Sequence, residues 1–339
     1  MKYSLLDVAA VGHGETPADA LHGAVPLAQA AERHGYHRVW YAEHHNMPQI
    51  ASAATSVLIA HVAAHTSRIR LGAGGVMLPN HAPLLIAEQF GTLAELHPGR
   101  IDLGLGRAPG SDQNTMRALR RTEQSADTFP QDILELQGYL TGATRIPGVR
   151  ATPGDGTNVP LYILGSSLFG AQLAATLGLP YAFASHFAPA ALQAAAATYR
   201  AQYRPSGERP EPYLIVAANL IAADDAQEAQ AQYQAALRWR ARRFLAPGRE
   251  LTEAQLDDLL ASPSGQQIRA MMRCTAAGTP DQVRAYLAAL AEETGADELI
   301  LAPAATTRAQ RIRAVELVPM PTPSAAPEPA PVSAAASPR

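Results

Sequence analysis

Eight short apolar segments recur along the 339-residue chain, each separated from the next by a longer amphipathic stretch. Their apolar residues are too dense to leave one face polar, which is typical of parallel strands that helices bury on both faces. The segments cover residues 3–11, 38–42, 69–75, 101–106, 161–165, 181–185, 213–222 and 298–302. This repeated pattern restricts the chain to α/β folds built on a parallel sheet.

The stretches between these segments are predicted to be helices. The first, over residues 17–35, has Thr16 as a candidate N-cap, Pro17 in its first turn and Gly35 at its end. Others are predicted over residues 52–65, 84–97, 122–141, 169–177, 189–203, 225–244, 252–260, 280–293 and 307–315. Eight strands that alternate with helices over residues 1–318 predict a TIM (β/α)8 barrel with extra helices after the seventh strand. A doubly wound open sheet is the alternative, because alternation alone does not distinguish a closed sheet from an open one.

The last 21 residues, 319–339, differ in composition from the rest of the chain. They contain seven prolines and six alanines and only two charged residues, Glu328 and Arg339. Such a segment buries too little apolar surface to offset its chain entropy, so we predict a disordered Pro/Ala-rich tail beyond the barrel.

The charge and hydropathy pattern bears on the partners and the compartment. The formal net charge of −3 gives no electrostatic reason to expect binding to nucleic acid or to an anionic membrane. The longest uncharged stretch, residues 156–199, is interrupted by prolines and serines and holds no apolar run of about 18 residues. Residues 3–11 are predicted to form a strand and not a secretory segment, so we expect a cytoplasmic protein.

Two residue counts exclude several chemistries. The only lysine, Lys2, is badly placed to form a Schiff base or to bind phosphate in a phosphate-binding loop, and the other 26 basic residues of the 27 are arginines. The only cysteine, Cys274, excludes an intramolecular disulfide, a multi-cysteine zinc site and a cysteine-ligated iron–sulfur cluster. The reaction must therefore depend on other polar side chains or on a bound cofactor.

Candidate site residues lie at the ends of the predicted strands, where the active sites of barrels of this kind are found. In chain order these residues are His44, His45, Gly74, Gly75, Met77, Arg107, Ser166, Ser167 and His186. The glycine pair indicates an unusual backbone or close approach to a flat ligand, with a simple turn as the alternative. A histidine at a strand end is a candidate acid–base group, because its pKa can be tuned near neutrality.

The strand ends also predict an anion site and argue against a metal site. The Ser166–Ser167 turn offers hydroxyls and N–H groups at a helix N-terminus, and Arg107 on the adjacent strand end can bind the same anion. The alternative is an ordinary helix cap beside a surface arginine. His44 and His45 are adjacent in the chain and point to opposite faces, and no further ligand stands at metal spacing, so no metal is expected.

Four sequence blocks resemble the bacterial luciferase-like flavin-dependent monooxygenase family, in particular its single-chain branch. They are WYAEHH at residues 40–45, IRLGAGGVMLP at 69–79, PGRIDLGLGR at 98–107 and YILGSS at 162–167. They stand in family order and at family spacing within residues 1–225. The sequence departs from the luciferases at Gly106, where they have a cysteine, and at Gly170, where they have a hydroxyl residue.

The resemblance implies an enzyme that binds FMN at the carboxyl end of the barrel. It assigns Arg107 and the Ser166–Ser167 turn to the FMN phosphate and places a cis peptide between Gly74 and Gly75, beneath the isoalloxazine ring. It makes His44 the catalytic residue at the reactive edge of the flavin. His45, Met77 and His186 are expected to line the substrate pocket.

The implied reaction uses reduced FMN and molecular oxygen to oxygenate a small organic substrate through a C4a-(hydro)peroxyflavin. The implied partners are a separate NAD(P)H:flavin reductase and a second copy of the chain in a homodimer. Three alternatives remain open: a deazaflavin-dependent oxidoreductase on the same barrel, a non-catalytic FMN-binding protein, and a phosphate-binding barrel isomerase or lyase.

Overall fold

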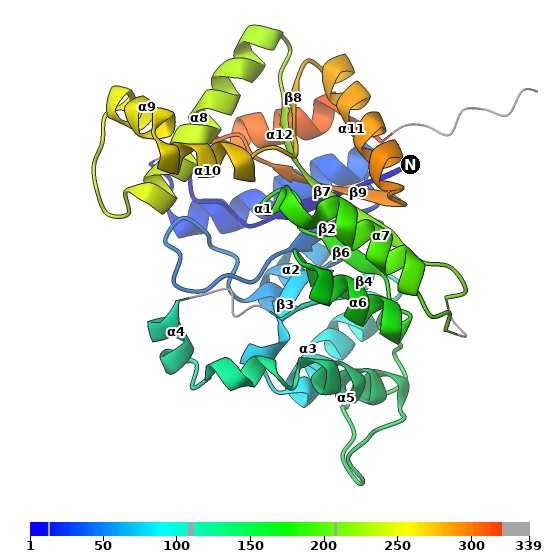
Figure 1. Cartoon of the computed structure of the whole chain (residues 1–339). Helices are drawn as coiled ribbons and strands as arrows, with labels where there is room; N and C mark the ends of the chain where they lie inside the picture. The colour runs from blue at the N-terminus through cyan, green and yellow to red at the C-terminus, as the bar shows by residue number, and fades with distance from the viewer. Residues whose placement is uncertain (13, 108–111, 207–208, 321–339) are drawn as a thin grey trace, which may run out of the picture.

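A closed barrel of parallel strands surrounded by helices forms the body of the protein in this computed structural model (Figure 1). The structure describes residues 1–12, 14–107, 112–206 and 209–320. Most of the predicted disordered tail, residues 321–339, lies outside these ranges.

The eight predicted barrel strands are all present. They are β1 (Lys2–Asp7), β2 (Arg38–Tyr41), β3 (Arg70–Met77), β4 (Ile101–Gly106), β5 (Leu161–Gly165), β6 (Tyr181–Phe183), β7 (Leu214–Ala222) and β9 (Glu298–Pro303). Each pairs in parallel with the next, and β9 pairs with β1. The ring is therefore closed, which excludes the open sheet and confirms the (β/α)8 barrel.

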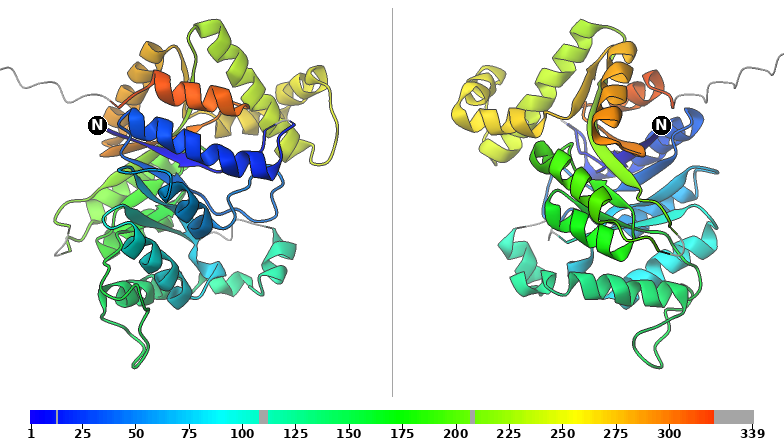
Figure 2. Two further views of the ribbon diagram at one scale, coloured as in Figure 1. Left: turned by 180° about the vertical axis from the view of Figure 1, so that it is seen from behind. Right: turned by 45° about the vertical axis from the view of Figure 1, so that its right-hand side comes forward.

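Helices surround the ring of strands in all views (Figure 2). Eight of them follow successive barrel strands: α1 (Pro17–Arg33), α2 (Thr55–Ala63), α3 (Pro83–Leu96), α5 (Phe129–Thr141), α6 (Leu168–Leu177), α7 (Leu192–Gln202), α8 (Ala226–Leu245) and α12 (Arg308–Leu317). Four more are α4 (Gln113–Ala118), α9 (Glu253–Ala261), α10 (Pro263–Met271) and α11 (Pro280–Thr294). Three of these extra helices follow α8, which confirms the predicted addition after the seventh strand.

Some details of the predicted elements were wrong. The helix expected over residues 122–141 is a short 3-10 turn, Glu123–Ala126, followed by α5, because Pro130 is suited to the first turn of a new helix. The sequence analysis missed α4 and α10, and also strand β8 (Thr275–Gly278), which pairs in parallel with the end of β7. Its alanines and glycine carry none of the β-branched or aromatic signal of a strand.

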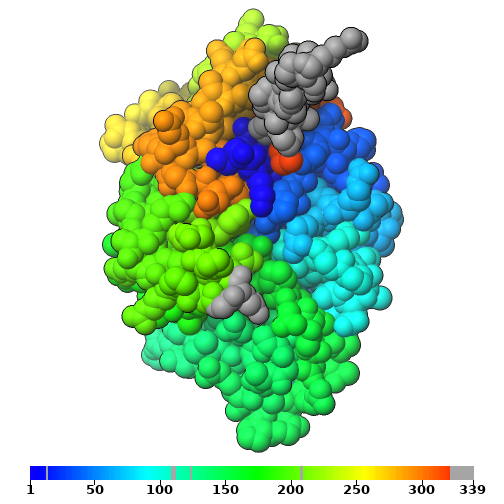
Figure 3. Space-filling view, turned by 90° about the vertical axis from the view of Figure 1, so that its right-hand side faces the viewer, coloured from blue at the N-terminus to red at the C-terminus, as the bar shows by residue number. Residues whose placement is uncertain are grey.

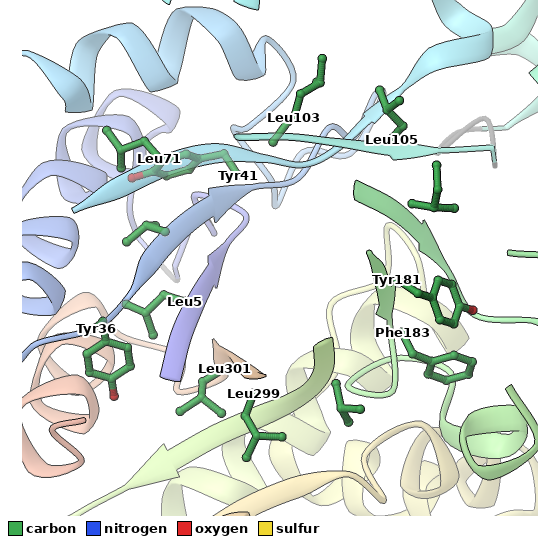
Figure 4. Close-up of a cluster of buried hydrophobic side chains, with 14 of the residues drawn as sticks. Leu5, Tyr36, Tyr41, Leu71, Leu103, Leu105, Tyr181, Phe183, Leu299 and Leu301 are labelled. Carbon is green, nitrogen blue, oxygen red and sulfur yellow. The ribbon is translucent and has the colours of Figure 1, made fainter. Parts of the chain in front are cut away.

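Successive side chains of the barrel strands enter two different apolar cores. One lies between strands and helices and includes Leu5, Leu71, Leu103 and Leu301, which point away from the ring in Figure 4. The other fills the barrel interior and contains Leu6, Trp40, Ala42, Tyr162, Ala182, Ile215, Ala217 and Ile300. The interior is thus a packed core, and ligands must bind at an end of the barrel.

The amino end of the barrel is closed by buried ion pairs. Figure 3 shows the face on which the N-terminus lies, and the parallel strands all begin on this side. Inside the barrel, Arg38 donates from Nη1 to Asp102 Oδ2 at 2.7 Å and from Nη2 to Glu298 Oε2 at 3.0 Å. Tyr162 Oη accepts a further hydrogen bond from Arg38, at 2.7 Å. Arg70 also pairs with Asp102, so two arginines balance the two buried carboxylates at this end of the barrel.

Candidate active site

The predicted site residues gather at the carboxyl ends of the strands. In Figure 1 this is the side opposite the labelled N-terminus, where α4, α9 and α10 lie. His44 and His45 follow β2, Arg107 follows β4, Ser166 and Ser167 follow β5, and His186 follows β6. Gly74, Gly75 and Met77 belong to the last half of β3. The parallel barrel therefore brings all of these residues to the same end.

Gly74 and Gly75 form a stretch of β3 that has no room for side chains. The peptide bond between them is cis, as the resemblance implies. A Cβ on Gly74 would lie 2.8 Å from Trp40 Cβ, and one on Gly75 would lie 2.7 Å from the Gly104 carbonyl oxygen. Both glycines are buried, and both positions require glycine because the neighbouring strands β2 and β4 fill the space that a side chain would need.

Arg107 lies against the beginning of α6. Its guanidinium carbon is 4.0 Å from the centre of the Phe169 ring, in the first turn of that helix. Ser167 occupies the N-cap position, but its side chain makes no capping hydrogen bond, and both Ser166 and Ser167 are exposed. An exposed arginine thus stands beside a helix N-terminus that lacks a side-chain cap, and this arrangement suits an anion such as a phosphate group.

His44 and His186 both have pKa values below that of a free histidine, and His44 contributes to the shift of His186. Burial lowers the pKa of His44, and the positive charge of Arg243 lowers it further. Burial, with the charges of Arg240 and His44, lowers the pKa of His186 to about 3. Both rings are therefore neutral near pH 7. Among the described residues, neither Nδ1 atom has a hydrogen-bond partner of normal geometry, although both atoms are buried.

Glu43 organises the loops that follow β2 and β3. Its buried carboxylate lies 2.6 Å from His45 Nε2 and 2.9 Å from His81 Nε2, and it accepts the backbone N–H of Met77 at 3.0 Å. Burial raises the pKa of Glu43, but the hydrogen bonds from His81, His45 and Met77 outweigh it and lower the pKa overall. His45 is therefore held by Glu43, while its neighbour His44 lies beside Arg243.

The sequence analysis missed several residues of this end of the barrel. Glu43 and His81 could have been found, because Glu43 stands in the first sequence block and His81 follows the second block by two residues. Arg240 and Arg243 belong to α8, and Asn219 to β7, and no pattern in the sequence predicted that they would lie near the histidines.

Two searches of the described residues have negative results. The described side chains include no group of three or more His, Cys, Asp or Glu residues that could hold a metal ion. Among the described helices, none is long and apolar enough to span a membrane.

Comparison with known proteins identifies the family. A family model described as luciferase-like monooxygenase matches residues 1–298. The chain belongs to the luciferase-like monooxygenase family. A protein of Escherichia coli K12 named luciferase-like monooxygenase is 48% identical over 305 residues, which cover 88% of this chain and 90% of that protein. An N-acetyl-S-alkylcysteine monooxygenase of Bacillus subtilis is 41% identical over 189 residues, or 54% of this chain and 57% of that protein.

Solved structures share the barrel. The crystal structure of apo-MsnO8 has a TM-score of 0.86 and 35% identity, covering 94% of this chain and 97% of that one. At 17% identity, the FMN complex of the oxygenating constituent of 3,6-diketocamphane monooxygenase from Pseudomonas putida has a TM-score of 0.71 and covers 94% of this chain and 96% of that one. An F420-dependent secondary alcohol dehydrogenase has a TM-score of 0.69 at 16% identity, covering 94% and 98%. The last two establish the fold alone.

Proposed function

We propose that this protein is a monooxygenase that uses reduced FMN and molecular oxygen to oxygenate a small organic substrate. The observation that carries the proposal is the exposed Arg107 beside the uncapped N-terminus of α6, at the same end of the barrel as the buried, neutral His44. The arginine and the helix N-terminus fit the phosphate of FMN, and the resemblance to the family puts its ring beside Gly74 and Gly75, at the same end of the barrel. Membership of the luciferase-like monooxygenase family supports oxygenation as the reaction.

Each residue then has a separate task. Arg107 and the N–H groups at the start of α6 hold the phosphate by charge and hydrogen bonds. Gly74 and Gly75 let the backbone approach the ring closely. When bound, reduced FMN supplies the electrons that activate oxygen.

His44 is the candidate proton-transfer residue. Its lowered pKa keeps the imidazole neutral near pH 7, so the ring can accept a proton, and Nδ1 is the atom left without a partner of normal geometry among the described residues. His186 is also neutral near pH 7, and protonation of His44 would disfavour protonation of His186. His45 and Met77 shape the surrounding loops through Glu43.

We further propose a cytoplasmic homodimer that receives reduced FMN from a separate NAD(P)H:flavin reductase. The monooxygenase names of relatives at 48% and 41% identity favour a cofactor that activates oxygen, which is the reason for choosing FMN over a deazaflavin that transfers hydride.

The test combines binding with isotope incorporation. The purified protein is titrated with FMN and with coenzyme F420 by fluorescence, and then supplied with reduced FMN and ¹⁸O₂ in the presence of ketones and thioethers. We expect FMN to bind and one atom of ¹⁸O to enter an organic product. Preference for F420 with hydride transfer, or FMN binding without any labelled product, would overturn the proposal in favour of the deazaflavin enzyme or the non-catalytic protein.

A further inference from the structure

The second half of α8 carries arginines on two different faces of the helix. Arg238 and Arg242, four residues apart, face the segment that contains α9. Arg238 forms ion pairs with Glu253 at 2.8 Å and with Asp257 at 2.6 Å. Arg242 is exposed and donates to the Leu251 carbonyl at 3.2 Å. These two arginines therefore have an ordinary structural role in holding α9 against α8.

Arg240 lies on another face of α8 and reaches into the carboxyl end of the barrel. Its Nη2 donates to Asn219 Oδ1 at 2.9 Å, and Asn219 is fully buried on β7. The amide nitrogen of Asn219 donates in turn to the His186 carbonyl at 2.8 Å. Burial, with the charge of Arg243, lowers the pKa of Arg240 to about 10, so the guanidinium remains charged at neutral pH.

Arg243, three residues further along, lies against the loop after β2. Its Nη2 is 2.7 Å from Met47 Sδ, and its guanidinium packs on the rings of Trp239 and Phe244, at 5.6 and 4.9 Å from their centres. Met47 follows His44 by three residues, and the charge of Arg243 lowers the pKa of His44. Both arginines thus point to the part of the site where His44 and His186 lie.

No negative charge balances these two arginines within the part of the chain that the structure describes. The ion pairs of that part include neither Arg240 nor Arg243. The nearby acid Glu43 is already hydrogen-bonded to His45 and His81. Both guanidiniums are partly withdrawn from water, which is unfavourable for a cation without a counter-charge, so this cluster is complementary to an anion that comes from outside the protein.

We propose that Arg240 and Arg243 bind the anionic group of an organic substrate, with a carboxylate as the ligand chemistry. A guanidinium binds a carboxylate through two parallel hydrogen bonds, and the position of Arg243 next to the His44 loop would hold the organic part of the ligand at the proposed reaction site. The inference rests on the proposed monooxygenase function only for the fate of the bound ligand. The phosphate of FMN has similar chemistry, so the experiment must distinguish the two anions.

The test measures the binding of two carboxylates, hexanoate and benzoate, by calorimetry with the full chain, both alone and with saturating FMN. The neutral hexanamide serves as the matched ligand. Arg240→Met and Arg243→Met keep the side-chain length and remove the charge, and Arg242→Met on the same helix is the control. We expect a carboxylate to bind more tightly than hexanamide, and each of the two variants to weaken it about 10–150-fold. FMN affinity and the Arg242→Met variant should be unchanged.

Two results would overturn the inference. Equal binding of hexanoate and hexanamide, or no binding of either carboxylate, would mean that these arginines are not a carboxylate site. A loss of FMN affinity in Arg240→Met or Arg243→Met would mean that the guanidiniums hold the flavin phosphate instead. Arg240→Lys separates loss of the charge from misfolding. It keeps the positive charge and should therefore retain more of the hexanoate affinity than Arg240→Met.

The same experiment keeps this inference separate from the proposed function. Carboxylate binding that depends on Arg240 and Arg243, in a protein that never incorporates ¹⁸O, would support the anion site and refute the monooxygenase. Oxygenation of neutral substrates by a protein that binds neither hexanoate nor benzoate would support the monooxygenase and refute the carboxylate site.

Discussion

Replacement of Glu43 by glutamine should destabilise the carboxyl end of the barrel. The carboxylate is 2% exposed and contacts His45 Nε2 at 2.6 Å and His81 Nε2 at 2.9 Å. Glutamine keeps the size of the side chain and can still accept the Met77 N–H, but it has no charge. The two histidine contacts therefore lose the strength that the charge gives them.

The size of the effect follows from these contacts. A hydrogen bond to a charged group contributes about 1.5–3 kcal/mol, and a neutral one about 0.5–1.5 kcal/mol. Each histidine contact of Glu43 should thus lose about 1–1.5 kcal/mol, or about 2–3 kcal/mol for both. For a chain of this length, roughly 2 °C of Tm corresponds to each kcal/mol, so we expect Tm to fall by about 4–6 °C.

Thermal melts followed by circular dichroism measure this difference. Glu95→Gln, at an exposed position on α3, is the matched control and should leave Tm unchanged. The folded-state pKa of Glu43 is lowered, so its contribution is present above the ordinary glutamate pKa of about 4.3 and is lost as the pH falls through the folded pKa. If the Tm of Glu43→Gln at pH 7 equalled that of the wild type or of Glu95→Gln, this account of the site would be refuted.

Three further predictions concern the proposed function and the buried histidines. Arg107→Ala should weaken FMN binding about 10–150-fold in a fluorescence titration, and unchanged affinity would remove Arg107 from the phosphate site. His44→Ala should lower turnover by about 10²–10⁴ while FMN still binds; a loss of FMN with normal turnover per bound flavin would make His44 structural. The pKa of His186 is about 3 in the folded protein and about 6.5 when unfolded, so the unfolded state binds more protons between these values and acid destabilises the fold. In urea unfolding between pH 6 and 4, the His186→Asn variant should lose up to about 1.4 kcal/mol per pH unit of this dependence, and an identical pH slope would contradict it.

The ring of strands could be predicted from the sequence because burial on both faces leaves a dense apolar signal at every barrel strand. The same rule failed for β8, which pairs only with the end of β7 and consists of threonine, alanines and glycine. Helix α10 was missed although Ser262 caps it and Pro263 stands in its first turn, because it begins directly after α9. Strand β8 therefore depends on its pairing with β7, whereas the start of α10 was marked in the sequence and overlooked.

The candidate site likewise contains residues that the sequence predicts and residues that it does not. The rule that function lies at strand ends brought His44, Gly75 and Arg107 together, since the position of a residue in a parallel strand fixes the end of the barrel at which it lies. It could not find Arg240 or Arg243, because their position depends on which face of α8 meets the barrel. Two arginines of the same helix, Arg238 and Arg242, face α9 instead, and the sequence does not distinguish the pairs.

The two ends of the barrel differ in whether a protein carboxylate pairs with their arginines, Arg38 being buried and Arg240 partly buried, and this difference supports a functional role for the carboxyl end. At the amino end, Arg38 meets Asp102 and Glu298, so its charge is balanced within the protein. At the carboxyl end, Arg240 has the neutral amide of Asn219 as its hydrogen-bond partner among the described side chains. The uncompensated charge is therefore better explained by a ligand that completes it, because real proteins depart from such rules mainly at functional sites.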